Sequence, residues 1–168
     1  WGGERLRWQA GPGRPVSGPG WVRVDPLADP AGLARAAEGC SAILCLSGVT
    51  PPRAALGADL GDNARLAEAA VHAGAVAGAR VVLTSSAAVY GNRAGELDED
   101  IPLTLQSDYG RAKADMETRG AALAAQLGVP LCSLRIGNIA GLDAILGGWR
   151  PGFRLDRFAG GRTPRRSY

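Results

Sequence analysis

Lysine is almost absent from this chain. The sequence has 168 residues and 19 basic residues, yet Lys113 is the only lysine and all the others are arginine. An ammonium is a compact charge whose pKa shifts readily, whereas a guanidinium is a planar fork that stays charged. Because arginine occupies every other basic position, we expect position 113 to need an ammonium for its chemistry.

Long hydrophobic runs are also missing. The chain has no apolar stretch long enough to span a membrane and no signal-peptide pattern. With 46% hydrophobic and 21% charged residues it has the composition of a globular protein. We therefore expect no membrane partner and a cytoplasmic location.

Few residues could bind a metal. The three cysteines, Cys40, Cys45 and Cys132, are odd in number, lie in apolar stretches and lack the spacing of metal ligands. Buried free thiols and no metal site are expected. The single histidine, His72, falls on a predicted helix and is interpreted as a surface residue.

Positive charge is concentrated near one end. The net charge is +3, and residues 149–168 hold six arginines against one aspartate. No helix-turn-helix, zinc-finger or aromatic-rich RNA-binding pattern accompanies them, so we do not expect a nucleic-acid partner. A site for an anionic small molecule fits better.

Glycine is plentiful, but it does not form a phosphate-binding fingerprint. The run at 11–20 contains prolines, which lack the amides that a phosphate needs, and no predicted helix follows it. It is interpreted as a surface loop.

Short apolar strands alternate with helices along the chain. Strands are predicted at 6–10, 21–24, 42–46, 80–85 and 131–135, and helices at 31–38, from a cap at Asp62 to near 74–78, and at 108–127 after a cap at Ser107. A turn is expected at Pro51 and Pro52, and a solvated acidic loop at 96–100. This alternation predicts an α/β fold with a doubly wound parallel sheet.

Polar residues follow several of these strands. Ser47, Ser86 and Asn138 each come just after a strand, and Tyr109 begins the helix that follows another. Ligands of such sheets lie beyond the carboxyl ends of the strands, so these residues should converge on one edge.

Tyr109 and Lys113 are four residues apart, which places them on one face of a helix. A cation beside a phenol lowers its pKa and allows proton exchange near neutral pH. The alternative is that Tyr109 and Lys113 lie on an ordinary solvated helix face and have no joint function, because short motifs such as this one often occur by chance.

Four landmarks in order give the pattern a wider context. They are Asp25 with Asp29 after a strand, the run Leu83 to Gly91, the Tyr109/Lys113 pair, and the run Leu134 to Gly141. With them the chain resembles the extended short-chain dehydrogenase/reductase family, of the NAD(P)-dependent sugar epimerase/dehydratase type. The resemblance implies a Rossmann-like fold and an NAD(P)-dependent enzyme.

The resemblance also implies roles for individual residues. Tyr109 would be the general acid/base, Lys113 would hold the nicotinamide ribose and lower the tyrosine pKa, and Ser86 would hydrogen-bond the substrate oxygen. The implied cofactor-binding residues are Asp25, Leu27, Leu46, Ser47, Gly48, Tyr109 and Lys113. Asn138 and Arg166 would join Ser86 in binding substrate, and Asn63 is a weaker candidate for an active-site asparagine.

Three departures from the family pattern qualify these roles. The glycine fingerprint is absent, together with the first strand and helix, so we expect an internal fragment with a nucleotide-binding part at 1–141 and the start of a substrate-binding region at 142–168. Ala87 and Ala88 stand where dehydratases carry an Asp-Glu pair, which disfavours dehydration. No acidic residue ends the strand at 6–10 and Arg14 lies nearby, which favours NADP over NAD.

The sequence thus leads to an epimerase or carbonyl oxidoreductase acting on a sugar or nucleotide sugar, with a possible homodimer through the two long helices. A non-catalytic NAD(P)-binding sensor or regulatory protein is the alternative. The joint presence of Ser86, Tyr109 and Lys113 favours the enzyme. An arginine-rich nucleic-acid binder is a third hypothesis, which rests only on residues 149–168.

Overall fold

The structure is a computed structural model that describes residues 6–93 and 95–137. Strands and helices are interspersed through this part of the chain, with one short 3₁₀ helix after the fourth strand. In order they are β1 (Trp8–Ala10), β2 (Trp21–Arg23), α1 (Pro30–Ala37), β3 (Ala42–Cys45), α2 (Pro51–Ala54), α3 (Asp62–Ala77), β4 (Arg80–Ser86), η2 (Ala87–Tyr90), α4 (Asp108–Leu127) and β5 (Leu131–Ile136).

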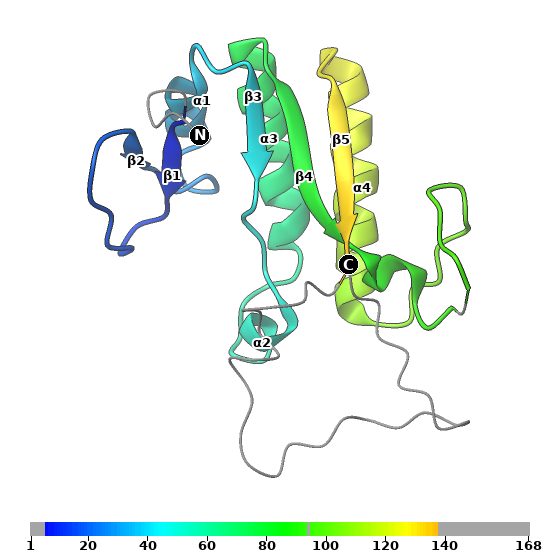
Figure 1. Ribbon diagram of the computed structural model, residues 1–168. Coiled ribbons are helices and arrows are strands. Elements are labelled where there is room, and N and C mark those ends of the chain that lie inside the picture. Colours follow the sequence, from blue (N-terminus) through cyan, green and yellow to red (C-terminus); the bar gives the residue numbers. More distant parts are fainter. Residues whose placement is uncertain (1–5, 94, 138–168) are drawn as a thin grey trace.

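Every strand pair is parallel. β1 pairs with β2, and β4 lies between β3 and β5, with Leu44 opposite Val82 and Val82 opposite Cys132. The β1–β2 pair lies beside the three-stranded sheet without pairing to it (Figure 1). The predicted α/β, Rossmann-like fold is therefore confirmed.

Helices α3 and α4 lie behind the three-stranded sheet in Figure 1. Side chains alternate between the two faces of a strand, so Val81 and Leu83 point toward these helices and are buried. Small residues let the layers approach closely: a Cβ added at Gly120 of α4 would lie 3.0 Å from Leu83 Cδ1. The core of this layer contains Ala64, Ala67, Ala70, Val71, Val81, Leu83, Met116, Ala124 and Val129.

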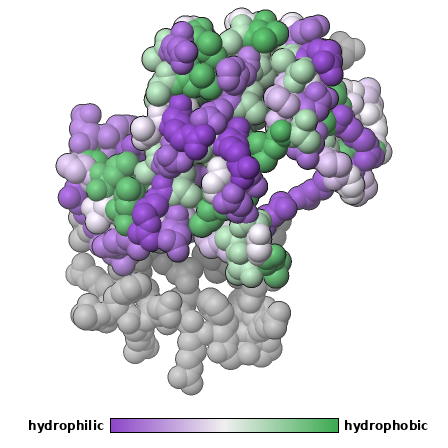
Figure 2. Space-filling model, turned by 180° about the vertical axis from the view of Figure 1, so that it is seen from behind, coloured by the Kyte–Doolittle hydropathy of each residue, from purple (hydrophilic) through white to green (hydrophobic). Residues whose placement is uncertain are grey.

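The opposite face of the sheet is apolar and open in the part of the chain that the structure describes. Leu44 of β3 is 58% exposed, and Leu134 of β5 is also exposed. The side seen from behind in Figure 2 mixes hydrophilic residues with hydrophobic ones.

Most helix ends follow the predicted signals. α1 begins at Pro30 after Asp29, whose Oδ1 accepts a hydrogen bond from Gly32 N at 2.7 Å. α4 spans the predicted residues, with Ser107 as its cap and Gly128 in the left-handed conformation after its end.

Two local predictions are wrong. Asp62 is the first residue of α3 rather than its cap, because Gly61 takes the cap position and the Asp62 carboxylate pairs with Arg65 at 2.6 Å. Pro51 and Pro52 begin a one-turn helix instead of a plain turn, since the fixed proline φ suits the first helical positions.

The cysteines and the histidine are placed as follows. All three cysteines are free, as predicted, but Cys40 and Cys45 are only partly buried and Cys132 is exposed, so the expectation of buried thiols is wrong. His72 is exposed, as expected. Among the described residues no cluster of metal ligands is found.

None of the described helices has the length and hydropathy needed to cross a membrane.

Candidate functional site

A pocket of about 240 Å³ lies where β3 and β4 end and α4 begins. Ligands of parallel α/β sheets are expected at this edge. The pocket brings together five predicted site residues, Leu46, Gly48, Ser86, Tyr109 and Lys113. The rest of its lining is Val49, Thr50, Thr84, Ser85, Ile136 and Gly137.

The start of α4 places Tyr109 at the pocket. Ser107 Oγ accepts a hydrogen bond from Gly110 N at 3.0 Å, which fixes the first turn of the helix. A Cβ at Gly110 would lie only 2.8 Å from Ala88 O of η2. Glycine is therefore needed here for α4 to approach η2 and the end of β4.

Lys113 is buried, with 4% of its surface exposed. Its Nζ donates to Thr84 O at 2.9 Å, lies 3.7 Å from Met116 Sδ and is 5.9 Å from the centre of the Tyr109 ring. Burial lowers the pKa of Lys113, and electrostatic interactions with Cys45 and Glu117 oppose that shift. The ammonium is thus held at the floor of the pocket by a backbone carbonyl.

The pKa of Tyr109 moves against the sequence-based expectation. Burial raises it above the usual value of 10.0, and a hydrogen bond with Ser86 only partly opposes this. The predicted lowering by Lys113 is not found in this structure: loss of hydration dominates the Tyr109 pKa, and the opposing effect comes from Ser86, while the Lys113 ammonium bonds to Thr84 O.

Ser86 is the last residue of β4. Its Oγ accepts a hydrogen bond from Ala88 N at 3.2 Å and so caps η2. The same hydroxyl lies beside the Tyr109 phenol and partly opposes the rise in the pKa of Tyr109. The end of β4 therefore places a hydroxyl next to the phenol.

Asn63 has a structural role in the described part of the chain. It is buried, its Oδ1 accepts from Val49 N at 3.2 Å, and its Nδ2 donates to Val49 O and Leu60 O at 3.1 and 3.0 Å. A Cβ at Gly48 would lie 2.7 Å from Asn63 Oδ1 and 3.4 Å from Lys113 Nζ. Gly48 thus leaves open the space beside the ammonium.

Other predicted residues lie elsewhere. Asp25 Oδ1 accepts hydrogen bonds from Leu27 N and Ala28 N, while Leu27 lines a separate hollow beside α3 and α4. Ser47 is exposed and is not part of the pocket lining. Asn138 and Arg166 lie outside the described residues, as does the predicted boundary between 141 and 142.

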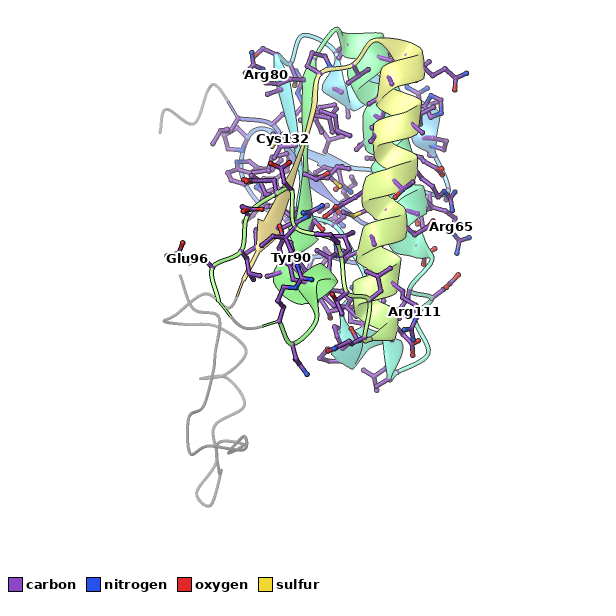
Figure 3. All side chains as sticks on the ribbon, turned by 90° about the vertical axis from the view of Figure 1, so that its right-hand side faces the viewer. Arg65, Arg80, Tyr90, Glu96, Arg111 and Cys132 are labelled. Atoms are coloured by element: carbon purple, nitrogen blue, oxygen red, sulfur yellow. The ribbon has the colours of Figure 1, made fainter. Side chains whose placement is uncertain are left out.

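Sequence reasoning missed a polar network behind the pocket. Glu117 of α4 accepts hydrogen bonds from Ser85 and from Arg135 of β5, and Arg135 Nη1 donates to Tyr90 Oη at 2.8 Å. Figure 3 shows Tyr90 beside the loop that carries Glu96. The signal available in the sequence was the position of Glu117, four residues after Lys113 and so on the same helix face.

Solved structures share this fold over most of the chain. DesIV, a dTDP-glucose 4,6-dehydratase from Streptomyces venezuelae with NAD bound, is 26% identical, with a TM-score of 0.65 over 75% of this chain and 41% of its own. MoeE5 in complex with UDP-glucuronic acid and NAD is 27% identical, with a TM-score of 0.64 over 89% of this chain and 51% of its own.

A more distant structure agrees in fold alone. It is a UDP-glucuronic acid 4-epimerase from Bacillus cereus, 19% identical with a TM-score of 0.62, which matches 72% of this chain and 39% of its own. The region that matches this chain makes up 41% of DesIV, 51% of MoeE5 and 39% of the epimerase. The chain therefore spans about 40 to 50% of the length of these proteins. Comparison with curated proteins gives no match.

The family described as the NAD dependent epimerase/dehydratase family matches residues 26–146. This range runs from the loop after β2 through β5 and includes every residue that lines the pocket. The parallel fold, the pocket at the strand ends and this match agree: the chain belongs to the NAD dependent epimerase/dehydratase family.

Proposed function

We propose that the protein is an NAD(P)-dependent epimerase or carbonyl oxidoreductase that acts on a sugar or nucleotide sugar. The observation that carries this proposal is the meeting of Ser86, Tyr109 and Lys113 in one pocket at the ends of parallel strands. A hydroxyl donor, a proton source and a cation at fixed positions are what the stabilisation of charge on one substrate oxygen requires.

The pocket fits the nicotinamide end of the cofactor. Lys113 Nζ uses one strong hydrogen bond, to Thr84 O, and the missing side chain at Gly48 leaves space beside it. An ammonium has three donors, so Lys113 can also hold ribose hydroxyls. Leu46 and Gly48 would contact the cofactor. When bound, the cofactor would accept a hydride from the substrate or return one to it.

The chain's own residues would handle the proton. Tyr109, with its raised pKa, is protonated at neutral pH and can donate a proton to the substrate oxygen. Ser86 would donate a hydrogen bond to the same oxygen, and Lys113 would stabilise negative charge on the phenol after proton transfer. Asp25, Leu27 and Ser47 would contact the cofactor, and Asn138 and Arg166 the substrate, as the family resemblance implies.

Epimerisation or carbonyl oxidoreduction is favoured over dehydration. Elimination of water needs an acid beside the leaving hydroxyl, and the two residues after Ser86 are Ala87 and Ala88. Ala87 is also buried in η2 and packs with Val89 and Tyr90. We therefore assign hydride and proton transfer, without elimination, to this pocket.

The cofactor is proposed as NAD or NADP. The sequence favours NADP through Arg14, but Arg14 is exposed in the loop between β1 and β2 and is not part of the pocket lining. The solved relatives named above carry NAD. The comparisons thus give no support to the NADP preference, and both cofactors belong in the test.

The proposal is tested by assaying the full chain with NAD or NADP against nucleotide sugars and free sugars. Formation of reduced nicotinamide is followed by absorbance, and epimers are separated by chromatography. We expect turnover that falls by roughly 100-fold or more in Tyr109→Phe, since general acid–base catalysis contributes that much. Cofactor binding without any turnover would instead identify a binding protein, and turnover unchanged in Tyr109→Phe would overturn the assignment of Tyr109.

A further inference from the structure

We propose that Glu117 and Arg135 are positioning residues for the Ser86, Tyr109 and Lys113 site, acting through Ser85 at the end of β4. This inference rests on the proposed function for its catalytic meaning. The geometry that supports it lies in residues that the structure describes.

Glu117 is bound from two strands at once. Its carboxylate accepts from Ser85 Oγ on β4 at 2.5 Å, from Arg135 Nε on β5 at 3.1 and 3.2 Å, and from Arg135 Nη2 at 2.8 Å. Both side chains of the ion pair are mostly buried. Two parallel N–H donors on one carboxylate fix both position and orientation.

Ser85 stands between the two residues of β4 that serve the pocket. Thr84 O, on one side, holds Lys113 Nζ at 2.9 Å. Ser86, on the other side, lines the same pocket as Tyr109 and partly opposes the rise in the pKa of Tyr109. Because the three residues are consecutive in one strand, anchoring Ser85 to Glu117 fixes the position of both neighbours.

Glu117 also lies one helical turn after Lys113, and its charge favours the ammonium form. The other groups around Lys113 are Cys45 of β3 and Tyr109 of its own helix, while Arg135 of β5 pairs with Glu117. Removing the Glu117 carboxylate should therefore lower the pKa of Lys113, and removing the Arg135 guanidinium should raise it.

The network continues to the loop above η2. Arg135 Nη1 donates to Tyr90 Oη at 2.8 Å, and Tyr90 Oη donates to Asp98 O at 2.8 Å. Tyr90 is buried in a second small core with Ala87, Val89 and Ala114. Arg135 thus ties the strand end, η2 and the acidic loop together.

The test uses the only lysine in the chain as its probe. Lysine labelled with ¹³C at Cε gives one NMR signal, whose pH titration reports the pKa of Lys113 without cofactor or substrate. In Glu117→Gln we expect this pKa to fall by roughly half a unit or more, because a neighbouring carboxylate favours the charged form. In Arg135→Gln it should rise, because the carboxylate loses its competing cation.

The matched control is the ion pair that joins Arg119, an exposed residue of α4, to Glu68 of α3. Arg119 binds Glu68 through two hydrogen bonds of 2.8 Å, and Arg119→Gln should leave the Lys113 titration unchanged. Circular dichroism confirms that each variant is folded. Should Glu117→Gln or Arg135→Gln not fold, Ser85→Ala, which removes only one hydroxyl from the network, should still move the Lys113 signal.

The outcomes separate this inference from the proposed function. With an active enzyme, Glu117→Gln should lower kcat by roughly tenfold to a hundredfold with a smaller change in KM, as for misplaced catalytic groups. If folded Glu117→Gln and Arg135→Gln both titrate like the wild type, the positioning role is overturned, whatever the activity. If the wild type fails to bind cofactor while Lys113 responds as expected, only the proposed function fails.

Discussion

Lys113 combines a buried position with a charge. Burial lowers its pKa, which means that the folded protein holds the ammonium at a cost in free energy. A residue kept for stability would not be expected to carry that cost. The arrangement is that of a group retained for its chemistry.

The first prediction concerns stability. Lys113→Met replaces the ammonium with an apolar chain of similar length, and the free energy of unfolding should stay within about 1 kcal/mol of the wild type or rise, as when buried charges are replaced by apolar groups. Urea unfolding at neutral pH measures it, with Lys113→Ala as the cavity-forming comparison. A loss of more than about 3 kcal/mol in Lys113→Met, the cost of breaking a buried pair, would show that Lys113 is chiefly structural.

The second prediction concerns pH. The Lys113 ammonium is lost as pH rises through a pKa below its usual 10.5, so affinity for NADH should decline at a lower pH than an exposed lysine would give. Between the lowered pKa of the folded protein and the 10.5 of the unfolded chain, Lys113 binds a proton more often in the unfolded chain than in the folded protein. The contribution of Lys113 to the free energy of unfolding therefore rises with pH in this window. An NADH dissociation constant that stays flat up to 10.5 would contradict this account.

The residues of the site could be predicted, but their electrostatics could not. Ser86 and Tyr109 were expected together because strand ends and a helix start meet at one edge of a parallel sheet, Lys113 was added by its four-residue spacing from Tyr109, and the family resemblance implied their joint site. The same reasoning also placed Ser47 there, and Ser47 is not part of the pocket lining. The direction of the Tyr109 pKa depends on burial by segments distant in sequence, and the Glu117–Arg135 pair depends on which strand lies beside β4. The spacing of residues along the chain therefore predicts neither the direction of the Tyr109 pKa shift nor the Glu117–Arg135 pair.

At the scale of elements, α4 positions the chemistry. Its first turn carries Tyr109, its second Lys113 and its third Glu117, and it packs on η2 through Gly110. The predicted bounds of α4, 108–127, agree with the structure because Ser107, Gly128 and Pro130 are strong local signals. The start of α3 was misplaced by one residue because Gly61 and Asp62 are both acceptable at a cap, and side-chain pairing decided between them.

The third prediction tests this packing. Gly110→Ala should lower the free energy of unfolding by about 1–3 kcal/mol, as overpacking does, even though alanine favours helices by about 1 kcal/mol. The reason is the 2.8 Å approach to Ala88 O. Gly11→Ala is the control, since its added Cβ meets nothing within 4 Å and should leave stability unchanged. Equal stabilities of the two variants in urea would show that α4 does not rest on η2.

At the scale of the whole molecule, one sheet face is packed and the other is open in the described part of the chain. The expected parallel order was predicted from the alternation of strands and helices. The doubly wound arrangement predicts helices on both faces, whereas among the described residues α3 and α4 cover one face and Leu44 and Leu134 are exposed on the other.

The fourth prediction compares the two faces. Leu83→Ala should cost about 2–5 kcal/mol, as for a fully buried leucine, whereas Leu44→Ala should cost less than about 1 kcal/mol. Leu83 is 0% exposed and Leu44 is 58% exposed, although they lie on neighbouring strands. Urea unfolding of both variants gives the comparison, and equal losses would mean that the face carrying Leu44 is covered.

Binding of NADH and NADPH, followed by nicotinamide fluorescence, decides whether this pocket holds the cofactor. The wild type is compared with Lys113→Met and with Arg119→Met, a control at an exposed position on the same helix. We expect the wild type and Arg119→Met to bind one of the two cofactors with equal affinity, and Lys113→Met to bind it at least about tenfold more weakly, the loss expected for a charged hydrogen bond. A wild type that binds neither cofactor, or a Lys113→Met variant that binds as well as the wild type, would contradict the assignment of this pocket.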